Sequence, residues 1–248
     1  MRAARAARAE MGYGLDGPLP DLLEAVEGPG GAQVVVLDLG EDVAGACIHR
    51  PGLALLFVNG RQATVRQRFT LAHEFGHRRL GHASVIDRPV DVFDARDRSE
   101  VEANYFAAEF LMPGEAVRGW ARGRALSLDD VVRLAAEYGV SAKMARIRLE
   151  TAGALRDRRR AARLDAEIDD NLHLGLAGLL GLPAMTDRLA EAAAAMPRLP
   201  DALRASALGA VLAGDLTVEQ AAARAGRSPE ELRRALTGLG LDRLVPVG

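Results

Sequence analysis

The chain has little of several residue types and patterns, and each shortage excludes a class of protein. Its single cysteine, Cys47, cannot form a disulfide within the chain, which excludes a secreted framework of disulfide-linked loops. No stretch approaches the ~18 uninterrupted apolar residues that a membrane helix needs. The arginine-bearing segment from Arg2 to Arg8 is not followed by the apolar run of a secretory signal. We therefore expect a cytoplasmic protein.

Aromatic residues and net charge are also scarce. Only 4% of the residues are aromatic, so the core must be built from Ala, Leu and Val. The 32 basic and 34 acidic residues give a formal net charge of −2, so no overall basic field indicates a nucleic-acid partner. By contrast, 49% of the 248 residues are hydrophobic and 27% are charged, which is typical of a folded protein with a catalytic domain and a smaller helical one.

The hydrophobic periodicity predicts a mixed first part and an all-helical remainder. Helices are expected within residues 1–27, strands at 33–39, 44–50 and 53–59, and a tight turn at 50–52. A helical period predicts a helix from Thr64 that Gly81 ends, then a charged loop at 83–98 and a second helix at 99–112. Serine caps predict helices at 127–138 and 141–151, the charge run at 156–170 predicts a connecting helix or linker, and 201–239 predicts three short helices.

The pentad His-Glu-Phe-Gly-His at residues 73–77 is the strongest chemical signal in the chain. On a helix, His73 and His77 lie one turn apart on a common face, where their imidazole nitrogens can bind one tetrahedral Zn²⁺ at ~2.0–2.1 Å. Glu74 lies one step around the helix and can take a proton from a zinc-bound water, as in zinc peptidases. Three of the five histidines, these two and His82, fall in this short segment, which favours a metal site over a solvated surface helix.

A catalytic zinc needs a third protein ligand and an open position for water. The metzincin spacing would require glycine at position 80 and histidine at position 83, where this chain has Leu80 and Ala83, so that pattern fails. A glutamate from the next helix is the other common solution.

The next predicted helix offers Glu100, Glu102 and Glu109 as candidates. Glu102 and Glu109 share a stripe with Phe106, so spacing alone does not choose between them. Ser99 and Glu102 also match a capping box, which would occupy that carboxylate with backbone N–H groups.

Two runs of the sequence resemble a known family. Residues 68–77, RFTLAHEFGH, and residues 102–113, EANYFAAEFLMP, are similar to the paired motifs of the ImmA/IrrE zinc metallopeptidases. The resemblance is specific over residues 50–115 and weaker to residue 155, and Phe110 stands where the family usually has leucine.

This resemblance implies an α+β fold, a cofactor and a substrate class. The expected fold is a minimal zincin-like core, with a small sheet packed on two metal-bearing helices and an all-α region after it. The expected cofactor is Zn²⁺, with Glu102 as the third ligand beside His73 and His77. The expected partner is a protein substrate, usually a helix-turn-helix transcriptional repressor whose cleavage releases a stress or mobile-element response.

Tyr105 and His82 are candidates to stabilise the oxyanion that forms at a cleaved carbonyl. Neither has a spacing that compels this role. Tyr105 is more often a core or rim residue at such a position, and His82 suits a helix C-terminus, where the dipole favours a cation.

Two later helix pairs have the spacing of a helix-turn-helix unit. In the last pair, Ala222, Gly226 and Leu232 supply the small residue, the turn and the apolar contact. DNA contact by these helices is one interpretation, but Glu230 and Glu231 stand where the second helix would enter a groove, so packing or protein contact is the alternative. The earlier pair, over residues 128–149, is expected to support the active-site helices.

These observations predict three regions and one leading function. The regions are a zincin-like metallopeptidase domain at 1–115, a helical extension at 116–155 and an all-α C-terminal domain at 156–248, with the helix-turn-helix-like motif at 201–240. The leading function is a zinc-dependent endopeptidase. The alternative is a DNA-binding regulator or adaptor that acts through its C-terminal helices, with a structural or vestigial metal site.

Overall fold

The computed structural model describes residues 1–28, 31–50, 52–83, 85–87, 97–182, 188–238 and 241–242. The elements of the first part are α1 (Arg2–Glu10), α2 (Leu22–Glu27), β1 (Gln33–Leu37), β2 (Gly45–Arg50), β3 (Leu53–Asn59), α3 (Thr64–Leu80), β4 (Val85–Asp87) and α4 (Arg98–Leu111). The helices that follow are α5 (Gly114–Ala121), α6 (Leu128–Tyr138), α7 (Ala142–Thr151), α8 (Arg158–Asp169), α9 (Leu172–Leu179), α10 (Arg188–Ala194), α11 (Asp201–Arg204), α12 (Ala207–Leu212), α13 (Val218–Arg224) and α14 (Pro229–Gly238). The α+β class predicted from the sequence is confirmed. None of the described helices combines the length and the apolar character needed to cross a membrane.

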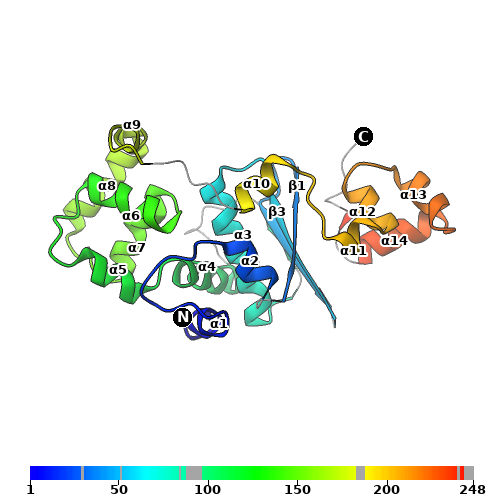
Figure 1. Ribbon diagram of the computed structural model, residues 1–248, viewed down its shortest axis with the longest axis horizontal. Coiled ribbons are helices and arrows are strands. Elements are labelled where there is room, and N and C mark those ends of the chain that lie inside the picture. The colour runs from blue at the N-terminus through cyan, green and yellow to red at the C-terminus, as the bar shows by residue number, and fades with distance from the viewer. Residues whose placement is uncertain are drawn as a thin grey trace.

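A four-stranded sheet in the order β1-β3-β2-β4 lies near the middle of an elongated molecule (Figure 1). Strands β2 and β3 pair antiparallel with Gly45 opposite Val58, and β1 pairs in parallel with β3. The three predicted strands are present, although β1 ends at Leu37. Strand β4 lies within the segment that was predicted to be a loop, because three residues there pair with β2. Residues 84 and 88–96 of that segment, and Pro51 of the predicted turn, lie outside the described residues.

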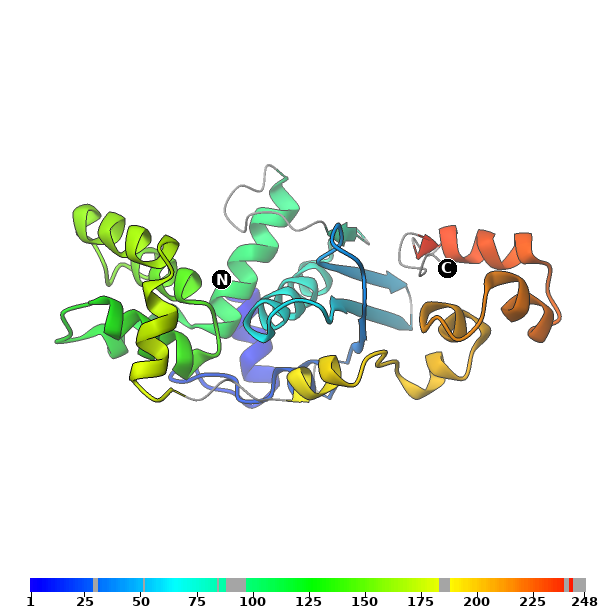
Figure 2. The same cartoon turned by 90° about the horizontal axis from the view of Figure 1, so that it is seen from above.

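Both faces of the sheet are buried, because successive side chains of β1 point into different hydrophobic cores. Val34 and Val36 join a hydrophobic core with α1–α4, α6 and α7, whereas Val35 and Leu37 join a second core on the opposite face. That second core is completed by side chains from α12, α13 and α14, which lie against the sheet on one side of the molecule (Figure 2). Helices α5–α9 lie on the other side, beyond α3 and α4.

Helices α3 and α4 pack closely because glycine stands at their contact. A Cβ at Gly76 would lie only 3.0 Å from the ring of Phe106, so any larger residue would push the helices apart. Gly81, at φ 72°, ends α3 in the left-handed conformation that glycine adopts without strain. The sequence-predicted helix and its stop are therefore both present.

Buried arginines connect the helical region to the sheet-bearing part. The guanidinium of Arg68 on α3 donates to the carbonyls of Leu19, at 2.8 Å, and Gly139, at 3.1 Å. The guanidinium of Arg148 on α7 donates to the Met112 carbonyl at 2.7 Å. The earlier helix pair thus supports the helices of the candidate site, as the sequence suggested. The domain division at residues 115 and 155 stays a prediction.

Helix caps follow the sequence signals closely in this region. Ser127 accepts a hydrogen bond from the backbone of Asp130 at the start of α6, and Ser141 caps α7 in the same way. In the last part, four helices replace the three that were predicted, because a break at residues 205–206 separates α11 from α12.

Candidate metal centre and active site

His73 and His77 lie one turn apart on α3, as their spacing predicts. Their Nε2 atoms are 2.9 Å apart, and both side chains are almost completely buried. Helical geometry alone produces this arrangement, because residues four apart lie on one face.

Glu100 on α4 provides the carboxylate nearest to the two imidazoles. Its Oε2 lies 3.2 Å from the Nε2 of His73, and its Oε1 lies 3.3 Å from the Nε2 of His77. Among the described residues, these three form a group whose potential ligand atoms all lie within 4.8 Å of one another. Burial raises the pKa of Glu100, but hydrogen bonds from both histidines outweigh it and hold the pKa far below the usual range. The carboxylate is therefore ionised, which is the form that ligates a metal.

The sequence predicted Glu102 as the third ligand, but the structure places its carboxylate outside the group formed by His73, His77 and Glu100. The side chain of Glu102 is 41% exposed and accepts hydrogen bonds from Arg98, at 2.7 Å, and from Nε2 of His82, at 3.3 Å. Two positions along a helix correspond to a rotation of about 200°. When Glu100 faces α3, Glu102 must therefore face away.

The capping-box interpretation of Glu102 is also wrong. The N-cap of α4 is Asp97, whose carboxylate accepts a hydrogen bond from the Ser99 backbone N–H at 2.7 Å. The helix therefore begins one residue before Ser99, and Glu102 does not bind the backbone at its start.

A signal in the sequence distinguishes Glu100 from its neighbours. Ala103 and Ala107 are fully buried and mark the face of α4 that packs on α3. Glu100 and Asn104 lie on this face at positions i and i+4, whereas Glu102 does not. Phe106 also contacts α3, against Gly76, so the spacing from Ala103 and Ala107, and not contact with α3 alone, distinguishes Glu100.

Hydrogen bonds orient both imidazoles. Nδ1 of His73 lies 2.9 Å from Oδ1 of Asn104, an acceptor, which stabilises a proton on Nδ1 and so leaves Nε2 able to exchange its hydrogen bond to Glu100 for a metal. Nδ1 of His77 lies 3.0 Å from Nδ1 of His82, whose Nε2 faces Glu102. The hydrogen-bonded chain Glu102–His82–His77 therefore orients the ring of His77 so that its Nε2, like that of His73, faces the cluster. Glu102 and His82 act on the site by positioning a ligand.

Glu74 is fully buried on α3, one residue after His73. Strand β2 approaches it closely, because a Cβ at Gly45 would lie 2.5 Å from Oε1 of Glu74 and 2.8 Å from the Phe57 carbonyl oxygen. Glycine at this position of the strand therefore makes room for the carboxylate. No local pattern predicted this requirement, because Gly45 is distant from Glu74 in the sequence and belongs to no motif.

The two other candidates from the sequence lie in different surroundings. Glu109 is buried and pairs with Arg148 and Arg5, so it connects α4 to α7 and α1 and is not a ligand. Burial raises the pKa of Glu109, but these two arginines and the backbone of Gly114 hold it below the usual range. Tyr105 is 57% exposed, and the described contacts assign it no role in the cluster.

Comparison with known proteins finds one family match. Residues 31–150 match the model of the peptidase M78 family, described as the IrrE N-terminal-like domain. This match, over 31–150, supports the resemblance to the ImmA/IrrE family. The match covers α3 and α4, and so both halves of the cluster. No curated protein matches the chain.

The ImmA/IrrE domain is metallopeptidase-like, and its family is a zinc-dependent class. Two imidazole nitrogens and one carboxylate oxygen are a common donor set for catalytic zinc. Ligands at ~2.0–2.2 Å in tetrahedral geometry stand roughly 3.3–3.5 Å apart. The two Nε2 atoms lie 2.9 Å apart, and each lies 3.2–3.3 Å from a different oxygen of Glu100, so the residues present fit the ion with small adjustments.

Proposed function

We propose that the chain is a zinc-dependent endopeptidase that acts in the cytoplasm. The observation that carries this proposal is the group formed by His73, His77 and Glu100, with Glu74 buried beside it on the same helix. A purely structural metal site would have no use for a buried carboxylate one residue from a ligand.

The residues divide the chemistry between them. His73, His77 and Glu100 would hold Zn²⁺, which when bound polarises the scissile carbonyl and makes water acidic enough to react near neutral pH. Glu74 then accepts the proton of the attacking water and passes it to the leaving nitrogen. Asn104 keeps His73 in the tautomer that presents Nε2 to the metal.

We also propose a substrate class. The family resemblance implies a helix-turn-helix transcriptional repressor, cleaved at one site during a stress or mobile-element response. The support for this part is the resemblance.

DNA contact by the C-terminal helices has less support. Arg233 pairs with Glu219, and Arg227 approaches Glu231 at 4.0 Å, so two candidate phosphate contacts are used within the module. The apolar faces of α12–α14 are buried against the sheet. We propose that these helices mainly complete the second core.

The test compares the wild-type protein with Glu74→Gln, using Glu115→Gln on an exposed part of α5 as a matched control. Each protein is incubated with unfolded casein and with a small helix-turn-helix repressor taken from the neighbouring genes. We expect Glu74→Gln to retain one zinc per chain but to cleave at least about 10³-fold more slowly, since it lacks the general base. Full activity in Glu74→Gln, or no stoichiometric zinc in the wild type, would overturn the assignment.

A further inference from the structure

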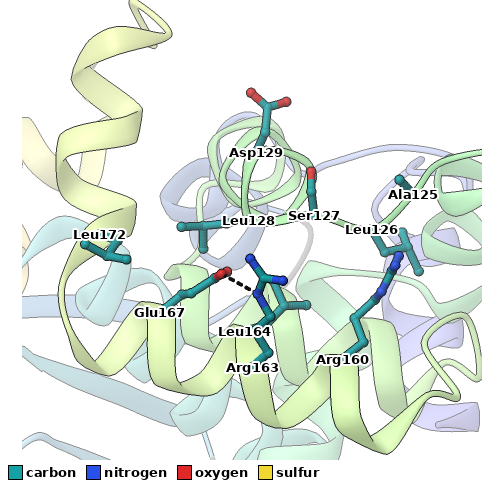
Figure 3. A pocket seen from close by; sticks show the side chains of 10 residues that line it. All are labelled: Ala125, Leu126, Ser127, Leu128, Asp129, Arg160, Arg163, Leu164, Glu167 and Leu172. Atoms are coloured by element: carbon teal, nitrogen blue, oxygen red, sulfur yellow. Dashed lines mark hydrogen bonds and ion pairs between the residues drawn. The ribbon is translucent and has the colours of Figure 1, made fainter.

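A second hollow lies away from the metal centre, between the start of α6, helix α8 and the start of α9. It is a cavity of about 380 Å³, within the size range of ligand sites. Figure 3 shows the residues that line it: Ala125, Leu126, Ser127, Leu128, Asp129, Arg160, Arg163, Leu164, Glu167 and Leu172. We call it the α8 pocket.

The floor of the α8 pocket is apolar. Leu126 and Leu164 are buried at its base, whereas Leu172 at its edge is 54% exposed. The apolar surface continues along α9, where Leu174 and Leu179 are 62% and 87% exposed. Exposed leucines gathered on one short helix indicate a surface that contacts another molecule.

Arginines form one wall of the pocket. In Figure 3, Arg160 and Arg163 extend from α8 toward the segment that precedes α6. Arg163 pairs with Glu167 at 2.8 Å, and Asp129 is neutralised by Arg133 at 2.7 Å. The two arginines and two acidic residues of the lining balance in charge, but within the described part of the chain Arg160 forms no ion pair, so its guanidinium is available to a carboxylate.

The charge order of α8 is the reverse of what stabilises a helix. Three arginines, Arg158, Arg159 and Arg160, occupy its first turn, and no acidic residue stands there. A helix N-terminus favours negative charge, so these arginines do not stabilise α8 itself. The acidic residues of its second half are used within the fold, since Asp165 pairs with Lys143 and Arg146. The carboxylate of Asp157 caps this end of α8 by accepting hydrogen bonds from the backbone N–H groups of Arg159 and Arg160.

We propose that the α8 pocket binds an acidic, leucine-containing amphipathic segment of the protein substrate. A leucine-type side chain lies on the pocket floor against Leu164 and Leu172, and a carboxylate of the same segment pairs with Arg160. This proposal rests on the proposed function, because it takes the ligand to be part of the peptidase substrate. The segment bound here would lie away from the metal centre.

The chemistry of the surroundings favours a peptide over a nucleic acid. An apolar floor has no partner on a phosphate backbone. An amphipathic peptide matches both the leucines and the arginines.

Binding is measured on the full-length Glu74→Gln protein, so that hydrolysis does not interfere. The probe is a fluorescein-labelled helical peptide with leucines at i, i+3, i+4 and i+7 and glutamates between them. We expect saturable binding that weakens with salt. Arg160→Ala should raise Kd about tenfold, and Leu172→Ser about fivefold.

Two matched variants control for charge and hydrophobicity. Arg224→Ala removes one exposed arginine from α13, and Leu179→Ser removes an exposed leucine of α9 that does not line the pocket. Both should bind the peptide as the parent does. Circular dichroism spectra and thermal unfolding check that all four variants stay folded.

Three outcomes would overturn the proposal: no peptide binding up to about 1 mM, equal Kd values for Arg160→Ala and Arg224→Ala, or binding of duplex DNA through Arg160 in place of the peptide. Failure of the proposed function is distinguishable, because a wild-type protein that lacks zinc or activity can still bind the peptide through this pocket.

Discussion

The identity of the third metal ligand gives the sharpest prediction. Glu100→Gln and Glu102→Gln make the same chemical change on one helix, two positions apart. The structure predicts that only Glu100→Gln removes a ligand, because the carboxylate of Glu100 is the one within 3.2–3.3 Å of both imidazoles.

The expected magnitude follows from the strength of zinc sites. Four-ligand zinc peptides bind the ion with about 10–16 kcal/mol, or about 2.5–4 kcal/mol per ligand. Loss of Glu100 should therefore weaken zinc binding by about 10²–10³-fold. Glu102 acts on His77 only through His82, so Glu102→Gln should weaken binding by about tenfold or less.

The assay is a competition titration in which the apo-protein and a chromophoric chelator share a limiting amount of Zn²⁺. Circular dichroism of each apo-variant serves as the folding control. If Glu102→Gln loses zinc as strongly as Glu100→Gln, or more strongly, the geometric argument for Glu100 is refuted.

Three further predictions concern the surroundings of the site. Glu109→Gln should lower the free energy of unfolding by about 3 kcal/mol at pH 7, because it leaves a buried arginine of α7 uncompensated. The folded-state pKa of Glu109 is depressed, so the stabilisation from its carboxylate is present above the unfolded pKa of ~4.3 and is lost as the pH falls. Urea unfolding should show that the difference in unfolding free energy between wild type and Glu109→Gln shrinks below that pH. A difference that stays constant with pH would contradict the assignment. Gly45→Ala should reduce peptidase activity while zinc is retained, since the new Cβ would lie 2.5 Å from Oε1 of Glu74; unchanged kcat would show that strand β2 does not hold that carboxylate. Arg68→Met should lower the free energy of unfolding by about 2–4 kcal/mol, because two buried carbonyls lose their donor. A change within about ±0.5 kcal/mol on denaturant titration would show that Arg68 does not stabilise the contact between α3 and the helical region.

Local signals in the sequence were sufficient for much of the fold. The Val- and Leu-rich runs predicted β1–β3, and the change of period at Thr64 predicted α3. The serines at 127 and 141 predicted the starts of α6 and α7, because a side-chain cap depends on residues three positions away. Strand β4 was missed because it is short and is defined by its pairing with β2.

The candidate site divides in the same way. The positions of His73, Glu74 and His77 relative to one another follow from one helix, so their spacing predicted them. The choice among Glu100, Glu102 and Glu109 depends on which face of α4 meets α3. The motif directed the prediction to Glu102, whereas the structure places Glu100 beside the histidines, since similarity of sequence does not specify the rotation of a helix.

By itself, the sequence determined the helix that presents two imidazoles and a carboxylate, because that geometry is set within one turn of backbone. Only the tertiary structure decided that Glu100 completes the group, that Gly45 makes room for Glu74, and that the arginines of α8 border an apolar pocket. These features join segments far apart in the chain, and packing between elements, rather than local conformation, sets which side chains meet.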